Sequence, residues 1–331
     1  MPKNDIEGPV HKTFYYHADA SAIGGTIHRP FSGFVPSQTS ISLPLVGGFL
    51  EKERKGRKWK DIVSYTNEST RVSGSKQDPD KDGPWTTEVS ASIEGLNILG
   101  VIEADKVVAQ LSVAHPHNGE QPTIALTGSK FENLRISGAA IDLDKVIRYD
   151  LFSEHDRSAE PDHRNRYPKE LWPRQEKLRE KIKNQKILAI QKYAAKYKDE
   201  PIPNWIHHHF HELEHDPGPN AKKIDLQRKS EDLAKDLIEE DARVGLNNDG
   251  NYVICSLIDH FPDLPPNFPG IVCGNGVYLP GYGRFFFGEV IIQQGTFRVS
   301  MIRAQLGSGI GGAMSAGVAS SNGQGSGPRG G

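Results

Sequence analysis

Apolar and polar residues alternate with a period of two along residues 85–138. Two sets of apolar residues recur at every second position: Val89, Ala91 and Ile93, then Val107, Ala109, Leu111 and Val113. Because successive side chains of a β-strand point to opposite faces of a sheet, each set shares one face. The pattern predicts consecutive β-strands whose apolar face packs against a second sheet.

Shorter alternating runs precede this block and follow residue 250. We expect residues 10–142 to form the first part of a β domain and residues 250–307 to form the second part. The apolar face of 85–138 is expected to close against 271–306. Core candidates in this later region are Phe285, Phe287, Val290, Ile292, Phe297, Val299 and Ile302. The predicted fold class is mainly β, an antiparallel sandwich or barrel.

Residues 143–249 break the β pattern, because charged residues are dense there and glycine is nearly absent. After Pro173, apolar residues recur at helical spacing, namely Leu178, Ile182, Ala189, Tyr193 and Tyr197. Two further helices are expected at about 204–215 and 224–244. The stretch therefore predicts a charged insertion of three amphipathic helices, whose charged faces are solvated and whose apolar stripe could also dock a partner.

Residues 308–331 are rich in glycine and serine and poor in apolar side chains. Ile310 and Met314 could finish a last strand. From Ser320 onward we expect disorder, since such a composition buries too little apolar surface to offset the entropy of ordering the chain. The prediction is a flexible glycine-rich C-terminal tail.

Three segments carry a family resemblance: GLNILGVIEADKVVAQL at 95–111, LTGSKFENLRISG at 126–138 and VYLPGYGRFFFGEVIIQQGTFRVSMIRAQLG at 277–307. Their order of glycine-containing and aliphatic strands resembles that of the bacterial choice-of-anchor proteins of the P type. The resemblance implies an all-β, surface-associated or secreted protein and brings no catalytic residues. It covers the β segments at both ends and leaves the charged insertion unmatched.

The overall charge argues against a nucleic-acid partner. The 331 residues carry a net charge of -2, so no global field attracts phosphates. The run KERKGRKWK at 52–60 is basic, but no aromatic platform accompanies it. We interpret the run as a solvated turn or an edge strand, where lysines discourage unwanted strand pairing.

The chain also lacks the marks of a membrane or secreted protein. No apolar run is long enough to span a membrane, and the N-terminus lacks the apolar core of a signal peptide, so we expect a cytoplasmic location. Cys255 and Cys273 could pair if the intervening loop folds back. Two thiols in a chain of this size are more often buried and reduced.

Residues 211–215 read His-Glu-Leu-Glu-His, an HExxH pattern. On a helix, His211 and His215 share a face and could bind Zn²⁺, with Glu212 as the general base and Glu231 as a third ligand. His207 extends the same face, so a non-catalytic metal site is an alternative. A plain exposed polar helix is another, because a charged residue occupies a position that zinc proteases usually keep apolar.

Two weaker metal candidates are also present. Asp78, Asp80 and Asp82 resemble the start of a calcium-binding loop, but the glutamate expected at its twelfth position is replaced by Val89. His115 and His117 flank a proline in a predicted turn, where solvent exposure is the ordinary explanation.

The sequence favours a non-catalytic β-scaffold protein that needs no cofactor. Its predicted role is structural or interactive, with a protein partner or a second copy of itself. The alternative function is a zinc-dependent hydrolase that uses the HExxH helix. Enzyme activity is therefore the less favoured of the two hypotheses.

Overall fold

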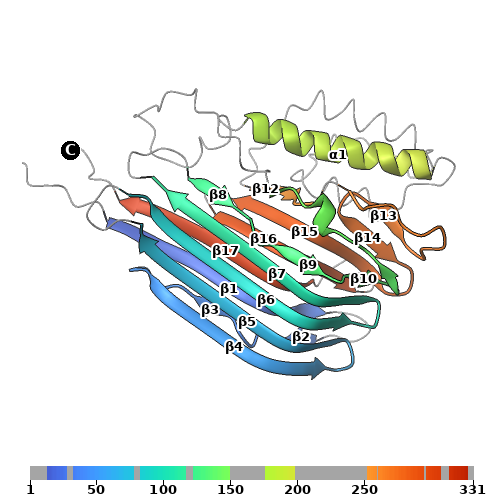
Figure 1. The fold of residues 1–331 in the computed structure, drawn as a ribbon, viewed down its shortest axis with the longest axis horizontal. Helices are drawn as coiled ribbons and strands as arrows, with labels where there is room; N and C mark the ends of the chain where they lie inside the picture. Colours follow the sequence, from blue (N-terminus) through green and yellow to red (C-terminus); the bar gives the residue numbers. More distant parts are fainter. Residues whose placement is uncertain are drawn as a thin grey trace, which may run out of the picture.

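Two antiparallel sheets and one long helix make up the described part of the chain (Figure 1). The structure is a computed structural model. It describes residues 13–27, 33–77, 83–116, 122–149, 176–197, 252–258, 260–293, 296–306 and 313–326. The two sheets pack face to face as a sandwich and do not close into a barrel. The prediction of a mainly β antiparallel fold is confirmed, with the sandwich as its form.

The first sheet, sheet A, joins the two ends of the chain. Its order is β13 (Ile271–Cys273), β14 (Gly276–Leu279), β15 (Gly283–Gln293), β16 (Thr296–Leu306), β17 (Met314–Ser326), β1 (Thr13–Ile27) and β2 (Gly33–Val35). Two strands lie off this path: β12 (Tyr252–Ser256) pairs with β15, and β3 (Ile41–Ser42) pairs with β1.

The second sheet, sheet B, is built from consecutive hairpins. Its order is β11 (Ala139–Ala140), β10 (Arg135–Ile136), β7 (Ile102–His115), β6 (Trp85–Ile98), β5 (Val63–Lys76) and β4 (Gly48–Trp59). The short strands β8 (Thr123–Ala125) and β9 (Lys130–Glu132) also pair with β7, and a 3-10 turn, η1 (Asp144–Val146), follows β11.

The alternating pattern of residues 85–138 faces the core as predicted. Its two apolar sets lie on β6 and β7 and are essentially inaccessible to solvent. They pack mainly on β1, β16 and β17, and Phe131 of β9 contacts Phe287 of β15 with ring centroids 6.0 Å apart. The expected closure against 271–306 is therefore right for β15 and β16. It is incomplete, because β1 and β17, from the two ends of the chain, also pack on this face. The core candidates are buried as well, except that the side chain of Ile292 is outside the description.

One helix of the predicted insertion is described, α1 (Glu176–Lys196). It lies on the outer face of sheet A, where Ala189, Ile190 and Tyr193 pack against Cys273 and Phe286. The other two predicted helices, at 204–215 and 224–244, lie outside the described residues. The structure thus supports one helix where three were expected, and this helix covers β13 to β15 (Figure 1).

The last strand that Met314 suggested is present as β17 (Met314–Ser326), and the prediction of disorder from Ser320 onward is wrong for residues 320–326. β17 pairs with β1 on one side and β16 on the other. Ala316, Ala319 and Ser321 are buried against sheet B. Pairing with β1 and β16 gives the backbone of β17 hydrogen-bond partners on both edges. The glycine and serine content therefore gave a wrong prediction, because a strand paired on both edges can be ordered without a high content of apolar residues.

Strands β4 to β7 share a crease, a transverse row at which the inward-facing positions shift by one residue. Consecutive inward-facing residues are three positions apart there instead of two: Tyr65 and Glu68 on β5, Ile93 and Leu96 on β6, Ala104 and Val107 on β7. The shift occurs in every strand at the same row, so cross-strand pairing resumes in register on both sides. The crease turns the inner face locally, as a β-bulge does in a single strand.

Two glycines make the crease sterically possible. Gly95 of β6 has φ of 59°, and a Cβ there would lie 2.7 Å from the Thr66 hydroxyl. A Cβ on Gly56 of β4 would lie 2.5 Å from the Tyr65 carbonyl oxygen. Thr66 Oγ1 donates a hydrogen bond to the Glu94 carbonyl at 3.0 Å, so the Thr66 side chain fills the space next to Gly95. Larger residues at either glycine would push the strands apart.

Candidate functional site

β4 is an edge strand that is exposed along nearly its whole length. Residues 48–58 are exposed, and Trp59, whose ring lies against Gly33 of β2, is half-buried. Among the described strands β4 is hydrogen-bonded only to β5, and it forms the lower border of sheet B in Figure 1. The interpretation of residues 52–60 as a basic edge strand is confirmed for 52–59.

The charges on β4 separate by face. Directly opposed residues of an antiparallel pair point to the same side of the sheet. Lys52, Arg54 and Arg57 lie opposite Thr70, Glu68 and Tyr65, which are all buried, so these three cations are on the inner face. We call Lys52, Arg54 and Arg57 the basic ledge. The crease at Gly56 keeps the third cation on the same face as the first two.

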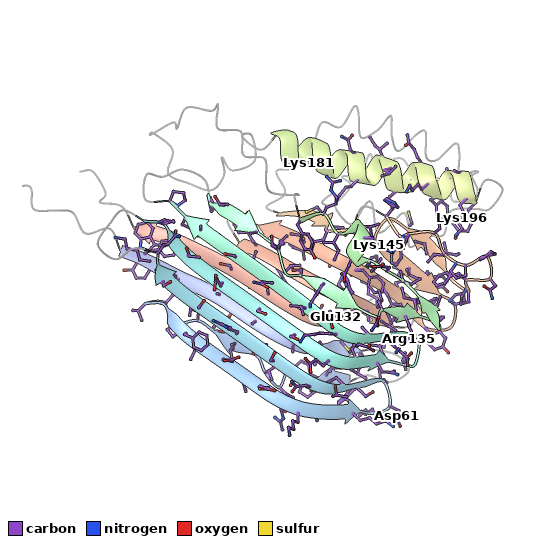
Figure 2. The ribbon with its side chains drawn as sticks, in the orientation of Figure 1. Asp61, Glu132, Arg135, Lys145, Lys181 and Lys196 are labelled. Atoms are coloured by element: carbon purple, nitrogen blue, oxygen red, sulfur yellow. The ribbon has the colours of Figure 1, made fainter. Side chains whose placement is uncertain are left out.

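The outer face of β4 is mixed in charge and partly paired. Asn67 Nδ2 donates to Glu53 Oε1 at 3.0 Å, and Arg71 stacks on the Phe49 ring at 4.8 Å. Lys58 forms an ion pair with Asp61 at 2.5 Å. Asp61 lies in the turn that leads to β5 (Figure 2). The ledge has no such partner, since no salt bridge joins its three cations to a carboxylate within the described ranges. It is thus a uniformly cationic surface.

A buried carboxyl group lies directly behind the ledge. Glu68 is 0 % exposed, and neither of its oxygens makes a hydrogen bond of ordinary geometry to a described residue. Burial raises the pKa of Glu68, while the Tyr65 hydroxyl and the positive charges of Arg54, Lys52 and Arg57 oppose the rise. The unpaired carboxylate makes the ionised form of this site costly.

Tyr65 is the inward neighbour of Glu68 across the crease. Burial raises the pKa of Tyr65 to about 12, and the negative charge of Glu68 and a hydroxyl–carboxylate contact outside ordinary hydrogen-bond geometry add to the rise. Thr70, the next inward residue, donates to the backbone carbonyl of Thr39 in the segment before β3. The inner face is therefore covered at β5, whereas the ledge residues of β4 are exposed.

An exposed apolar corner adjoins the start of the ledge. Leu45 and Val46 lie in the turn that carries the chain from sheet A to sheet B, and Leu50 is the first large inner-face residue of β4. The turn depends on Gly47, which has φ of 84° and would place a Cβ 2.6 Å from the Gly74 carbonyl oxygen. The surface therefore runs from apolar to basic along one strand.

One arrangement resembles a catalytic triad without the required connections. Ser42 Oγ donates to Asp19 Oδ1 at 2.5 Å, and His17 Nδ1 lies 3.5 Å from Asp19 Oδ2. A serine nucleophile needs the histidine as its direct base, with the carboxylate behind the histidine. Here the carboxylate is in the middle, so the geometry does not activate Ser42.

The predicted zinc residues His207, His211, Glu212, His215 and Glu231 all lie outside the described residues, as do Asp78, Asp80 and Asp82. Their metal-binding roles therefore stay predictions. Within the described ranges, no group of three histidine, cysteine or acidic side chains is placed to hold a metal ion. No helix in those ranges is long and apolar enough to cross a membrane.

His115 and the cysteines can be compared with the predictions directly. The expected solvent exposure of His115 is wrong, because its ring packs 5.0 Å from that of Phe14 and burial lowers its pKa to about 4. Cys255 and Cys273 are buried free thiols, as favoured. Burial, followed by the charge of Glu289, raises the pKa of Cys255 to about 12, and burial raises that of Cys273. Neither thiol is poised for nucleophilic chemistry.

Comparison with known proteins gives one family. A family model described as a domain of unknown function, DUF8256, matches residues 14–293. No curated protein and no solved structure matches the chain. The matched range begins in β1 and ends with β15, so it includes β4, the crease and the ledge.

Proposed function

The chain belongs to the DUF8256 family, a domain of unknown function, and on that premise we propose that it is a non-catalytic interaction protein that binds an acidic polypeptide segment at the basic ledge. The carrying observation is the exposed inner face of β4, where Lys52, Arg54 and Arg57 have no salt-bridge partner among the described residues. Exposed cations of one sign that form no salt bridge favour an anionic ligand.

The shape of the surface favours a polypeptide among anionic ligands. Alternate residues of a strand are roughly 7 Å apart on one face, and an extended peptide presents carboxylates with the same repeat. The apolar corner of Leu45, Val46 and Leu50 offers contact area for a neighbouring apolar side chain. A single-stranded nucleic acid would need exposed aromatic platforms, and the inner face of β4 has only Trp59, which lies against Gly33.

Self-association through β4 is disfavoured by the same charges. Antiparallel pairing of two copies of β4 would place the ledge of one copy beside the ledge of the other. Like charges directly opposed across a strand pair are destabilising. A partner that differs from this chain therefore fits the ledge better than a second copy.

The test is a titration of the protein with a glutamate-rich peptide in which calorimetry measures the binding. We expect the variant Lys52→Gln/Arg54→Gln/Arg57→Gln to bind about tenfold more weakly than the wild type, since exposed ion pairs contribute a few tenths to one kcal/mol each. The matched control Lys55→Gln/Lys58→Gln removes cations from the outer face of the same strand and should bind normally. Binding of single-stranded nucleic acid in preference to the peptide would refute the proposal.

A further inference from the structure

The free edge of β4 offers main-chain groups as well as charges. An edge strand presents a row of N–H and C=O groups that can pair with an added strand. β4 has twelve residues, which makes its open edge about 40 Å long. No described element pairs with that edge, so a peptide that lies along the ledge can also extend sheet B.

An added strand must follow the crease. Pairing between β4 and β5 skips one position, that of Gly56 and Thr66, and then resumes in register. Pairing of β5 with β6 skips two positions and that of β6 with β7 skips one, and both also resume in register. Each of the four strands therefore shifts its inward face by one residue at this row. A fifth strand in the same register inherits the shift, since opposed residues share a face.

The crease fixes the spacing of the residues that face the ledge. Its cations are at positions 52, 54 and 57, two and then three residues apart. We propose that the partner adds as a further strand on β4 and carries acidic residues with this spacing, two then three if it runs parallel to β4 and three then two if antiparallel. This inference rests on the proposed function and specifies its ligand.

The proposal predicts a spacing of acidic residues in the partner, and the net charge of the partner alone would not predict that spacing. A straight strand with acids at every second position would place one of its three carboxylates on the outer face beyond the crease. Near the crease that face carries Lys55 and Lys58, and Lys58 is already paired with Asp61. The misplaced carboxylate therefore faces none of the three cations of the ledge. The arrangement thus discriminates between acidic peptides of equal charge.

The experiment compares fluorescent peptides of equal composition. Two peptides carry three glutamates in the two spacings given above, and a third carries them at every second position. A further pair repeats the tighter-binding sequence with N-methyl groups on one or the other alternate set of backbone nitrogens, which blocks main-chain pairing and keeps the charge. The full chain is titrated into each peptide, and binding is followed by anisotropy.

We expect one of the two crease-matched peptides to bind roughly tenfold more tightly than the regular one. One of the two N-methyl patterns should weaken binding by a similar factor, as the loss of a few main-chain hydrogen bonds would. Equal binding of all the peptides would overturn strand addition and leave acidic recognition standing. If none binds, the proposed function fails with it.

Discussion

Replacement of Glu68 by glutamine should stabilise the protein at neutral pH. The side chain is 0 % exposed and both its oxygens lack a hydrogen bond of ordinary geometry within the described residues. Burial raises its pKa above the ordinary value of 4.5. The folded state therefore favours the protonated acid, whose contribution to stability is fully present below pH 4.5 and is lost as the pH rises through the folded-state pKa.

The size of the effect follows from the missing partners. A buried polar group left unsatisfied costs about 1–3 kcal/mol, and a charged one costs more. The cations of the ledge offset part of that cost, since they oppose the rise in pKa. We expect Glu68→Gln to raise the free energy of unfolding by about 1–3 kcal/mol at pH 7. The gain should vanish near pH 4, where wild-type Glu68 is already neutral.

Urea denaturation followed by circular dichroism between pH 4 and pH 8 measures this difference. Glu51→Gln is the matched control, because Glu51 is an exposed glutamate on the outer face of β4. It should change stability little at any pH. If Glu68→Gln instead lowers stability at pH 7, the ionised carboxylate is well paired and the account of the site behind the ledge is wrong.

Three further predictions test other parts of the account. A chain that ends at residue 312 loses β17, which joins β1 to β16, and should be unfolded or insoluble; a soluble, folded product would contradict a central position of that strand. His115 has a pKa lowered to about 4 by burial, so stability should be full above pH 6.5 and fall by up to about 3 kcal/mol as the pH drops to 4; His115→Phe should lose this dependence in urea titrations at each pH. If the HExxH segment binds zinc, mass spectrometry of the native protein should show one zinc that is lost in His211→Ala/His215→Ala, and the absence of high-affinity zinc would end the hydrolase alternative.

Residue patterns in the sequence predict the parts of the fold that follow strict alternation. Val89 and Val107 mark the inner faces of β6 and β7 because each set repeats at every second position up to the crease. The basic run of 52–60 suggests an exposed turn or edge strand for a different local reason, since so many charges do not fit between two neighbouring strands. These features depend on local sequence, and local sequence is sufficient to read them.

The crease and the terminal strand depend on neighbours that are far apart in the chain. Tyr65 and Glu68 face the same side only because four strands shift together, and no single strand reveals the shift. β17 is ordered by pairing with β1, which lies about three hundred residues earlier. Tertiary pairing overrides the local preference of its glycines and serines. The resemblance to choice-of-anchor proteins stays a prediction, because the family match does not test it.

The most direct test of the central claim is a reversal of charge on the ledge. Lys52→Glu/Arg54→Glu/Arg57→Glu changes three exposed residues, so the fold should persist, as circular dichroism would verify. The account predicts that wild-type protein binds the crease-matched glutamate peptide in a salt-sensitive way and that the reversed variant binds the equivalent lysine peptide instead. If both proteins bind both peptides equally, or if neither protein binds either peptide, β4 is not the recognition surface.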